Sequence, residues 1–252
     1  TGMGYASLIT NTTGTNNTAY GHNSLYANTT SSNNTALGTN ALIANTTGSS
    51  NAAVGSGALD ANTTGAANTS VGVSSLGSTT TGQHNVAVGY YANYGNVSGD
   101  YNVTMGLQAG RWTTGSNNTA LGYQSMFGLS GQSSASNNTA VGSQSLFTNT
   151  TGDKNTAVGH EALTANTSGA RNTAVGSVSL QSNTTGVDNT ALGRGTLSNN
   201  VSGAQNTAIG KSALEVNIAS NNTAVGHQSL DANTSGANNT AVGQASLTAN
   251  TT

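Results

Sequence analysis

The chain has 252 residues, of which only 12 are charged (5 Lys or Arg and 7 Asp or Glu), and its formal net charge is −2. So few basic residues argue against electrostatic capture of nucleic acid or of an anionic membrane, because both need clustered Lys and Arg. There is no Cys to build a disulfide framework, and the apolar runs are too short for a membrane-spanning helix.

One motif repeats along the whole chain. Its clearest copy is Asn-Thr-Ala-Val-Gly at residues 155–159, followed by Leu163 and then by Asn-Thr-Ser-Gly at residues 166–169. Eleven of the fourteen intervals between successive motif Gly residues are 17 residues long, two are 16 and one is 20. A fixed period of this kind is typical of a solenoid. We therefore predict an all-β fold, a parallel β-solenoid of about fifteen 17-residue coils, with residues 1–252 as a single repetitive segment of a longer fibre.

The strand of each coil is expected around the Ala and Val before the motif Gly. The residue just before this Gly is large and apolar in every coil, the residue before that is Ala in twelve of fifteen, and Leu follows the Gly by four positions in twelve. Neighbouring residues of a strand point to opposite faces, so two adjacent apolar columns predict a strand that is buried on both faces. We expect the Val and Leu columns to fill the coil and the Ala column to point outward.

An outward column of small residues would allow another chain to approach closely. We therefore expect the chain to associate with itself, most simply as a homotrimer, through the Ala column. The predicted oligomer interface includes Ala36, Ala87, Ala157, Ala174 and Ala241.

The remaining positions of the repeat are typical of turns and ladders. Asn-Thr-Thr-Gly segments and the Asn before Thr-Ala-Val tolerate positive φ and form side-chain hydrogen bonds to the backbone. Pro is absent, as expected where nearly every N–H joins a ladder. The charged residues and His fall in a few columns, which we expect to be solvated.

Residues 225–230 (Val-Gly-His-Gln-Ser-Leu), 121–126 and 141–146 resemble the head repeat of YadA-type trimeric autotransporter adhesins. The Asn-Asn-Thr-Ala-Val-Gly array is also similar to repeats of tail-fibre-like and bacterial surface proteins. The 17-residue period is longer than the adhesin repeat. The resemblance covers essentially the whole chain, and it implies a left-handed parallel β-roll that is trimeric and works as a fibre or adhesin.

No combination of residues predicts catalysis, a cofactor or a metal site. Gly-Lys-Ser at residues 210–212 lacks the earlier Gly that a phosphate-binding loop requires, since residue 205 is Gln. His160 and Glu161 are adjacent, and four scattered His are better explained as surface variation. The five Asp do not recur as a calcium-binding roll requires. A left-handed β-helix enzyme is disfavoured because the period is not a multiple of six.

Asn-x-Ser/Thr sequons are dense along the chain. They are either glycosylation sites of an extracellular protein or a by-product of the Asn and Thr that the turns require. The candidate sites include Asn11, Asn16, Asn28, Asn33, Asn45, Asn62, Asn149, Asn166, Asn183 and Asn233.

The repeat is least regular between residues 90 and 136, where Asn93 and Gly110 interrupt the Leu column. Aromatic residues gather there, and they either contact a glycan or receptor or fill the gaps that Asn93 and Gly110 leave. The candidate contact residues are Tyr90, Tyr91, Tyr94, Arg111 and Trp112.

These observations favour a structural fibre without enzymatic activity: the shaft of an adhesin, a tail fibre or a surface filament. We expect it to lie outside the cell, on a cell surface or on a virion, and to partner itself and a glycan or cell-surface receptor. The alternative is a solenoid that binds ice or a glycan through a Thr-rich or aromatic face.

Overall fold

The computed structural model describes residues 1–131 and 133–251. These residues form short strands joined by turns and bends, with no helix among them, and so none that could cross a membrane. All strand pairs are parallel, which confirms the predicted all-β parallel solenoid. The strands are β1 (Gly2–Met3), β2 (Thr18–Tyr20), β3 (Thr35–Leu37), β4 (Ala52–Val54), β5 (Thr69–Val71), β6 (Val86–Val88), β7 (Val103–Met105), β8 (Thr119–Leu121), β9 (Thr139–Val141), β10 (Thr156–Val158), β11 (Thr173–Val175), β12 (Thr190–Leu192), β13 (Thr207–Ile209), β14 (Thr223–Val225) and β15 (Thr240–Val242).

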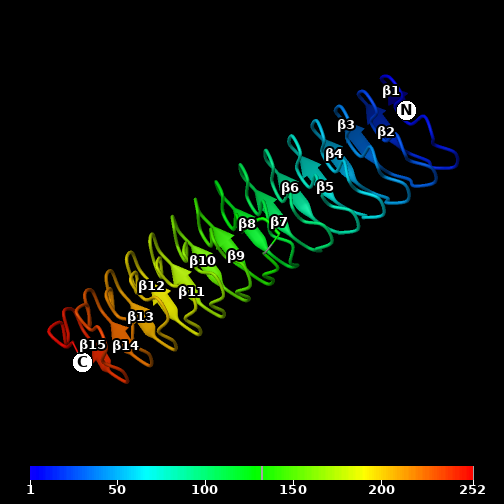
Figure 1. The fold of residues 1–252 in the computed structure, drawn as a ribbon. Coiled ribbons are helices and arrows are strands. Elements are labelled where there is room, and N and C mark those ends of the chain that lie inside the picture. Colours follow the sequence, from blue (N-terminus) through cyan, green and yellow to red (C-terminus); the bar gives the residue numbers. More distant parts are fainter. Residues whose placement is uncertain (132, 252) are drawn as a thin grey trace. The chain divides into compact units, whose positions relative to one another are not determined.

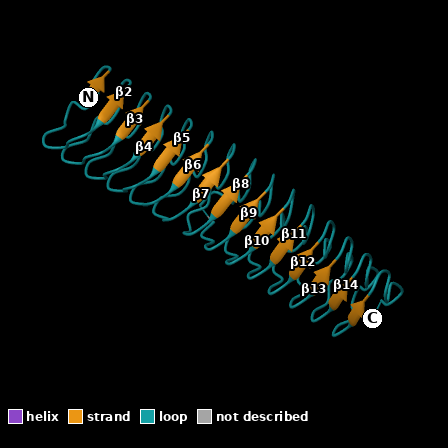
Figure 2. Cartoon of the chain, turned by 180° about the vertical axis from the view of Figure 1, so that it is seen from behind, coloured by secondary structure: helices purple, strands orange, loops and turns teal. Residues whose placement is uncertain are grey.

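The coils group into two compact units, Thr1–Leu121 with β1–β8 and Gly122–Thr252 with β9–β15. Within each unit every strand pairs with the equivalent residues of the next strand, as in β10 and β11, where Thr156 is opposite Thr173. The ribbon shows each unit as a stack of similar coils (Figure 1), and the strands of a unit lie along one side of its stack (Figure 2).

The interior of the coil differs from the prediction in one respect. The Leu column is buried as expected, with ten Leu and Met126 fully inaccessible. The Ala column, however, also points inward: Ala36, Ala87, Ala157 and Ala174 are 0% exposed in the single chain, and Ala241 is 3% exposed. The apolar residue before the motif Gly faces outward instead and is half-buried or exposed in every strand. The predicted Ala interface was therefore wrong.

The inward position is small because the coil is narrow. Where Ser70 replaces Ala, its hydroxyl lies within hydrogen-bond distance of the Ser75 hydroxyl across the interior and donates to the Ser75 carbonyl at 2.8 Å. Where Thr104 replaces Ala, Gly110 replaces the Leu of the same coil, and a Cβ at Gly110 would lie 2.7 Å from Thr104 Cγ2. The wall that faces the strand thus leaves room for a methyl group and little more, and the larger Val must point outward.

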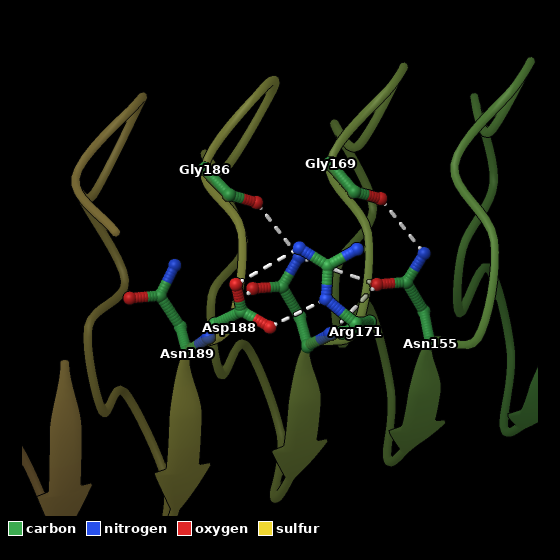
Figure 3. Close-up of polar contacts among 7 residues, drawn as sticks. Asn155, Gly169, Arg171, Gly186, Asp188 and Asn189 are labelled. Atoms are coloured by element: carbon green, nitrogen blue, oxygen red, sulfur yellow. Dashed lines mark hydrogen bonds and ion pairs between the residues drawn. The ribbon is translucent and has the colours of Figure 1, made fainter. Parts of the chain in front are cut away.

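Buried Asn residues connect each coil to the next (Figure 3). The Asn172 side chain donates through Nδ2 to the Gly186 carbonyl at 2.8 Å, and its Oδ1 accepts the Asn189 N–H at 3.0 Å. Asn155 makes the equivalent bonds one coil earlier. A second Asn column, represented by Asn166 and Asn183, is linked by amide-to-amide bonds of 2.9–3.0 Å. Each coil therefore satisfies polar groups of its neighbour as well as its own.

A Thr column adds a further ladder. The hydroxyl of Thr46 donates to the Thr63 carbonyl at 3.0 Å, and Thr63 repeats the bond to Thr80 at 3.0 Å. The same bond joins Thr167 to Thr184 in the second unit. Hydrogen bonds along these columns run parallel to the stack, as in cross-β assemblies.

The charged side chains are half-buried or exposed, as predicted for the solvated columns. The one ion pair between Lys or Arg and an acid in the described chain joins Arg171 and Asp188 of successive coils, with Nε to Oδ1 at 2.6 Å and NH2 to Oδ2 at 2.9 Å. The Arg171 hydrogen bond holds the pKa of Asp188 below its ordinary value, whereas burial raises the pKa of Asp60.

We expect Asp60→Asn to stabilise the protein at neutral pH. Because burial raises the folded-state pKa of Asp60, the folded chain keeps a proton between 3.8 and that raised pKa, where the unfolded chain has already released it. The free energy of unfolding therefore falls as pH rises through this range, and at neutral pH the folded chain holds a half-buried charge. The gain from Asp60→Asn should be present at pH 7 and disappear below the ordinary pKa of 3.8. Urea denaturation at several pH values measures it.

Asp188→Asn is the control with the opposite sign. Its folded-state pKa is lowered, so its contribution is present at neutral pH and is lost as pH falls through the folded pKa. This variant should therefore reduce stability at pH 7. An Asp60→Asn gain that persists in strong acid would contradict the assignment to burial of the charge.

Candidate binding surfaces

The outward face of the strands is the most regular surface of the molecule. In most coils it carries a Thr and, two residues later, an aliphatic residue, with the inward Ala between them, as in Thr156, Ala157 and Val158 of β10. Thr stands at the outward position next to the inward Ala, and β-branched residues such as Thr are favoured at exposed positions of a pleated strand. No charged residue occupies either outward column.

In the first unit this face becomes more apolar over β5–β7. Val86 and Val103 replace the outward Thr, and Val73, Tyr90 and Leu107 stand at the second residue after the outward aliphatic one, where most other coils are polar. The exposed fractions reach 50% at Met105 and 46% at Leu107. We call this set the apolar patch: Val71, Val73, Val86, Val88, Tyr90, Val103, Met105 and Leu107.

The structure brings the five predicted contact residues together. The ring centroids of Tyr90 and Tyr91 are 4.4 Å apart, those of Tyr91 and Tyr94 are 4.9 Å apart, and those of Tyr94 and Trp112 are 5.7 Å apart. The Arg111 guanidinium lies 4.8 Å from the Tyr91 centroid and 4.9 Å from the Trp112 centroid. These edge-to-face and cation–π geometries are favourable in themselves.

Tyr90 connects this aromatic cluster to the apolar patch. It is 47% exposed, whereas Tyr91, Tyr94, Arg111 and Trp112 are half-buried. The cluster residues other than Tyr90 therefore pack against one another and leave less of their surface exposed to solvent. A partner that contacts the cluster meets Tyr90 together with the neighbouring aliphatic side chains.

The aromatic residues do not fill the gap at Gly110. Thr104 and Asn93 fill the space at Gly110, since a Cβ there would lie 3.4 Å from Asn93 Oδ1 and closer still to Thr104. Tyr94 and Trp112 pack over glycines of the preceding coil: a Cβ at Gly77 would lie 2.9 Å from the Tyr94 ring, and one at Gly95 would lie 2.7 Å from Trp112 Cε3.

Most predicted glycosylation sites are inaccessible in the folded chain. The side chains of seven candidates belong to the buried Asn column, are at most 1% exposed, and donate through Nδ2, the atom that would carry a glycan, to a carbonyl three residues ahead. Asn11 is half-buried and makes the same bond at 2.9 Å. Asn16 and Asn33 are exposed. The prediction was wrong for Asn28, Asn45, Asn62, Asn149, Asn166, Asn183 and Asn233.

The described residues contain no pocket and no cluster of three or more His, Asp or Glu that could hold a metal ion. His160 Nε2 and Glu161 Oε1 are 3.7 Å apart on the surface. The apolar patch was missed from the sequence, although the replacement of Thr by Val86 and Val103 in consecutive coils was the signal that could have revealed it.

A scan against protein-family models and searches of curated proteins and of solved structures found no match to this chain.

Proposed function

We propose that this protein is a structural component of an extracellular fibre, located on a cell surface or a virion, and that it performs no catalysis. The observation that carries the proposal is the repetition of one set of bonds between coils. Buried Asn, Thr hydroxyls and strand backbone all link a coil to its neighbours, as between Asn155 and Asn172. Such ladders resist bending and separation of the coils, which is what a shaft requires.

Self-association is part of this proposal. The Ala column is inside the coil, so a companion chain needs another surface, and the apolar patch offers it the exposed side chains of Tyr90, Met105 and Leu107. Exposed patches of this kind mark protein–protein contacts, and aromatic residues and Met are enriched at their centres. A homotrimer in which three patches meet would remove Met105 and Leu107 from water.

A receptor or glycan could bind at the edge of the same region in an adhesin. Tyr90 is the exposed member of the aromatic cluster and Arg111 supplies its cation. Exchange of Tyr90 for Ala should then weaken binding to cells or glycans while the half-buried remainder of the cluster keeps its packing.

The test is the mass in solution together with electron microscopy. We expect elongated particles whose mass is a multiple, most simply three times, of the 24.7 kDa chain. Met105→Asp with Leu107→Asp should shift the mass toward that of one chain, because two carboxylates cannot be buried without partners. Val201→Asp with Ile218→Asp is the matched control, since these side chains are 46% and 54% exposed outside the patch.

Globular particles would refute the fibre function. A wild-type chain that remains a monomer at every concentration would refute self-association alone. Equal effects of the two double variants would show that the patch is not the contact surface.

A further inference from the structure

The second unit presents an unbroken array on the outward face of its strands. Every strand from β9 to β15 has the form Thr-Ala-aliphatic, so two parallel columns point away from the core. We call this the Thr/aliphatic face. Its Thr column is Thr139, Thr156, Thr173, Thr190, Thr207, Thr223 and Thr240, and its aliphatic column is Val141, Val158, Val175, Leu192, Ile209, Val225 and Val242.

The fold does not use the hydroxyls of this face. Thr167 and Thr184, in the turns, donate to carbonyls of the next coil. None of the Thr hydroxyls on the face makes a hydrogen bond to a described residue, although their side chains are half-buried or exposed. Strand propensity explains why a β-branched residue stands at this position, but it does not explain why the residue is Thr and not Val. Val is compatible with the fold here, since Val86 and Val103 occupy the equivalent position in the first unit.

The spacing of the array is regular in two directions. Equivalent residues of successive strands are in register, as Thr173 with Thr190, which places them about 4.8 Å apart. Thr and the aliphatic residue two positions later are separated by about 6.7 Å along the strand. Hexagonal ice has rows of oxygen atoms whose repeats are close to both distances, so this face can position hydroxyl and methyl groups over successive lattice sites.

The absence of charge on the face supports the same ligand. A charged side chain holds its own hydration shell, whereas hydroxyl and methyl groups can accommodate water in an ordered, ice-like layer. The charged residues of the second unit lie outside these two columns. Lys154 and Arg171 are in turn positions, and Arg194 and Lys211 stand two residues after the aliphatic column, at its edge. A ligand that matches this face must itself repeat at the coil spacing.

We propose that the Thr/aliphatic face of the second unit binds ice. This goes beyond the proposed shaft function and uses a different surface from the apolar patch. The expected result for the full chain is a gap between the melting and freezing temperatures of ice, together with enrichment of the labelled chain in a growing ice crystal.

Two substitutions in one coil provide the decisive comparison. Thr190→Lys places a long cation at the centre of the face and should abolish most of the thermal hysteresis and the enrichment in ice. Thr185→Lys makes the same change at an exposed turn position whose hydroxyl is also unused, and should leave both measurements unchanged. Thr173→Lys, one strand away, should reproduce the loss, and circular dichroism should show an unchanged fold for all three.

Several outcomes would overturn the proposal. Wild-type chain that neither produces thermal hysteresis nor enters ice would do so directly, and so would equal losses in Thr190→Lys and Thr185→Lys. If Thr190→Lys lowers the mass in solution while the wild type has no effect on ice, the face is an interface between copies. The fibre function is judged separately, by particle shape.

Discussion

Gly159→Ala is expected to disrupt the stacking of coils and to destabilise the protein by more than about 4 kcal/mol. The Gly has a φ of +140°, which L-residues rarely adopt, and an added Cβ would lie 2.5 Å from the Gly176 carbonyl oxygen and 2.6 Å from its carbon. Both atoms belong to the backbone of the next coil, so no side-chain rotation can relieve the contact. The coils would have to separate and stretch the Gly176 N–H to Val158 carbonyl bond, now 2.8 Å. Urea denaturation followed by far-UV circular dichroism measures the loss.

Gly195→Ala is the matched control. This Gly also has a positive φ of +67°, but an added Cβ would meet only the Ser212 hydroxyl, at 3.6 Å. Ala6 and Ala245 occupy the equivalent position in other coils with φ of 54° and 53°. We expect a change within about 1 kcal/mol. If both variants lose equal stability, backbone conformation and not the close approach of coils explains the motif Gly.

The repeat period predicted the architecture because each coil obeys the same local rules. The spacing of motif Gly residues located the strands, and the Leu column located the core, as Leu163 and Leu180 confirm. The inversion of Ala and Val could not be read from alternation, since alternation separates two faces without saying which is inside. The width of the coil decides that, and the paired replacements Thr104 and Gly110 were the available sign of a narrow interior.

The candidate sites were predictable to a smaller degree. The repeat period was enough to place Tyr94 beside Trp112, because residues about 17 apart lie on successive coils. Sequons gave no guide to accessibility, since the same Asn that begins a sequon is the one whose amide the ladder buries, as at Asn45 and Asn166. A motif defined by three residues carries no information on the burial of the first.

Asn172→Ala should destabilise the protein by about 1–3 kcal/mol, because it leaves the buried Asn189 N–H without a partner. The Gly186 carbonyl keeps the bond from Asn183 Nδ2 at 3.1 Å. The Asn172 side chain is 0% exposed, accepts the Asn189 N–H at 3.0 Å and donates to the Gly186 carbonyl at 2.8 Å. Each unsatisfied buried group costs about 1–3 kcal/mol, and water cannot readily replace the amide inside a coil this narrow. Hydrogen exchange should show faster opening at the Asn189 amide, and the urea midpoint should fall.

Asn199→Ala is the matched control, because it makes the same substitution at an Asn outside the buried ladder. Asn199 is exposed, its side chain makes no hydrogen bond to a described residue, and Ala44 and Ala165 occupy the equivalent position in other coils. Its substitution should change stability by less than about 0.5 kcal/mol. If Asn172→Ala is equally mild, the strand backbone, the Leu column and the other ladders hold the coils together without this Asn column. The proposed shaft function would then lose the buried amide bonds from which we argue its resistance to bending, such as the bond from the Asn189 N–H to Asn172 Oδ1.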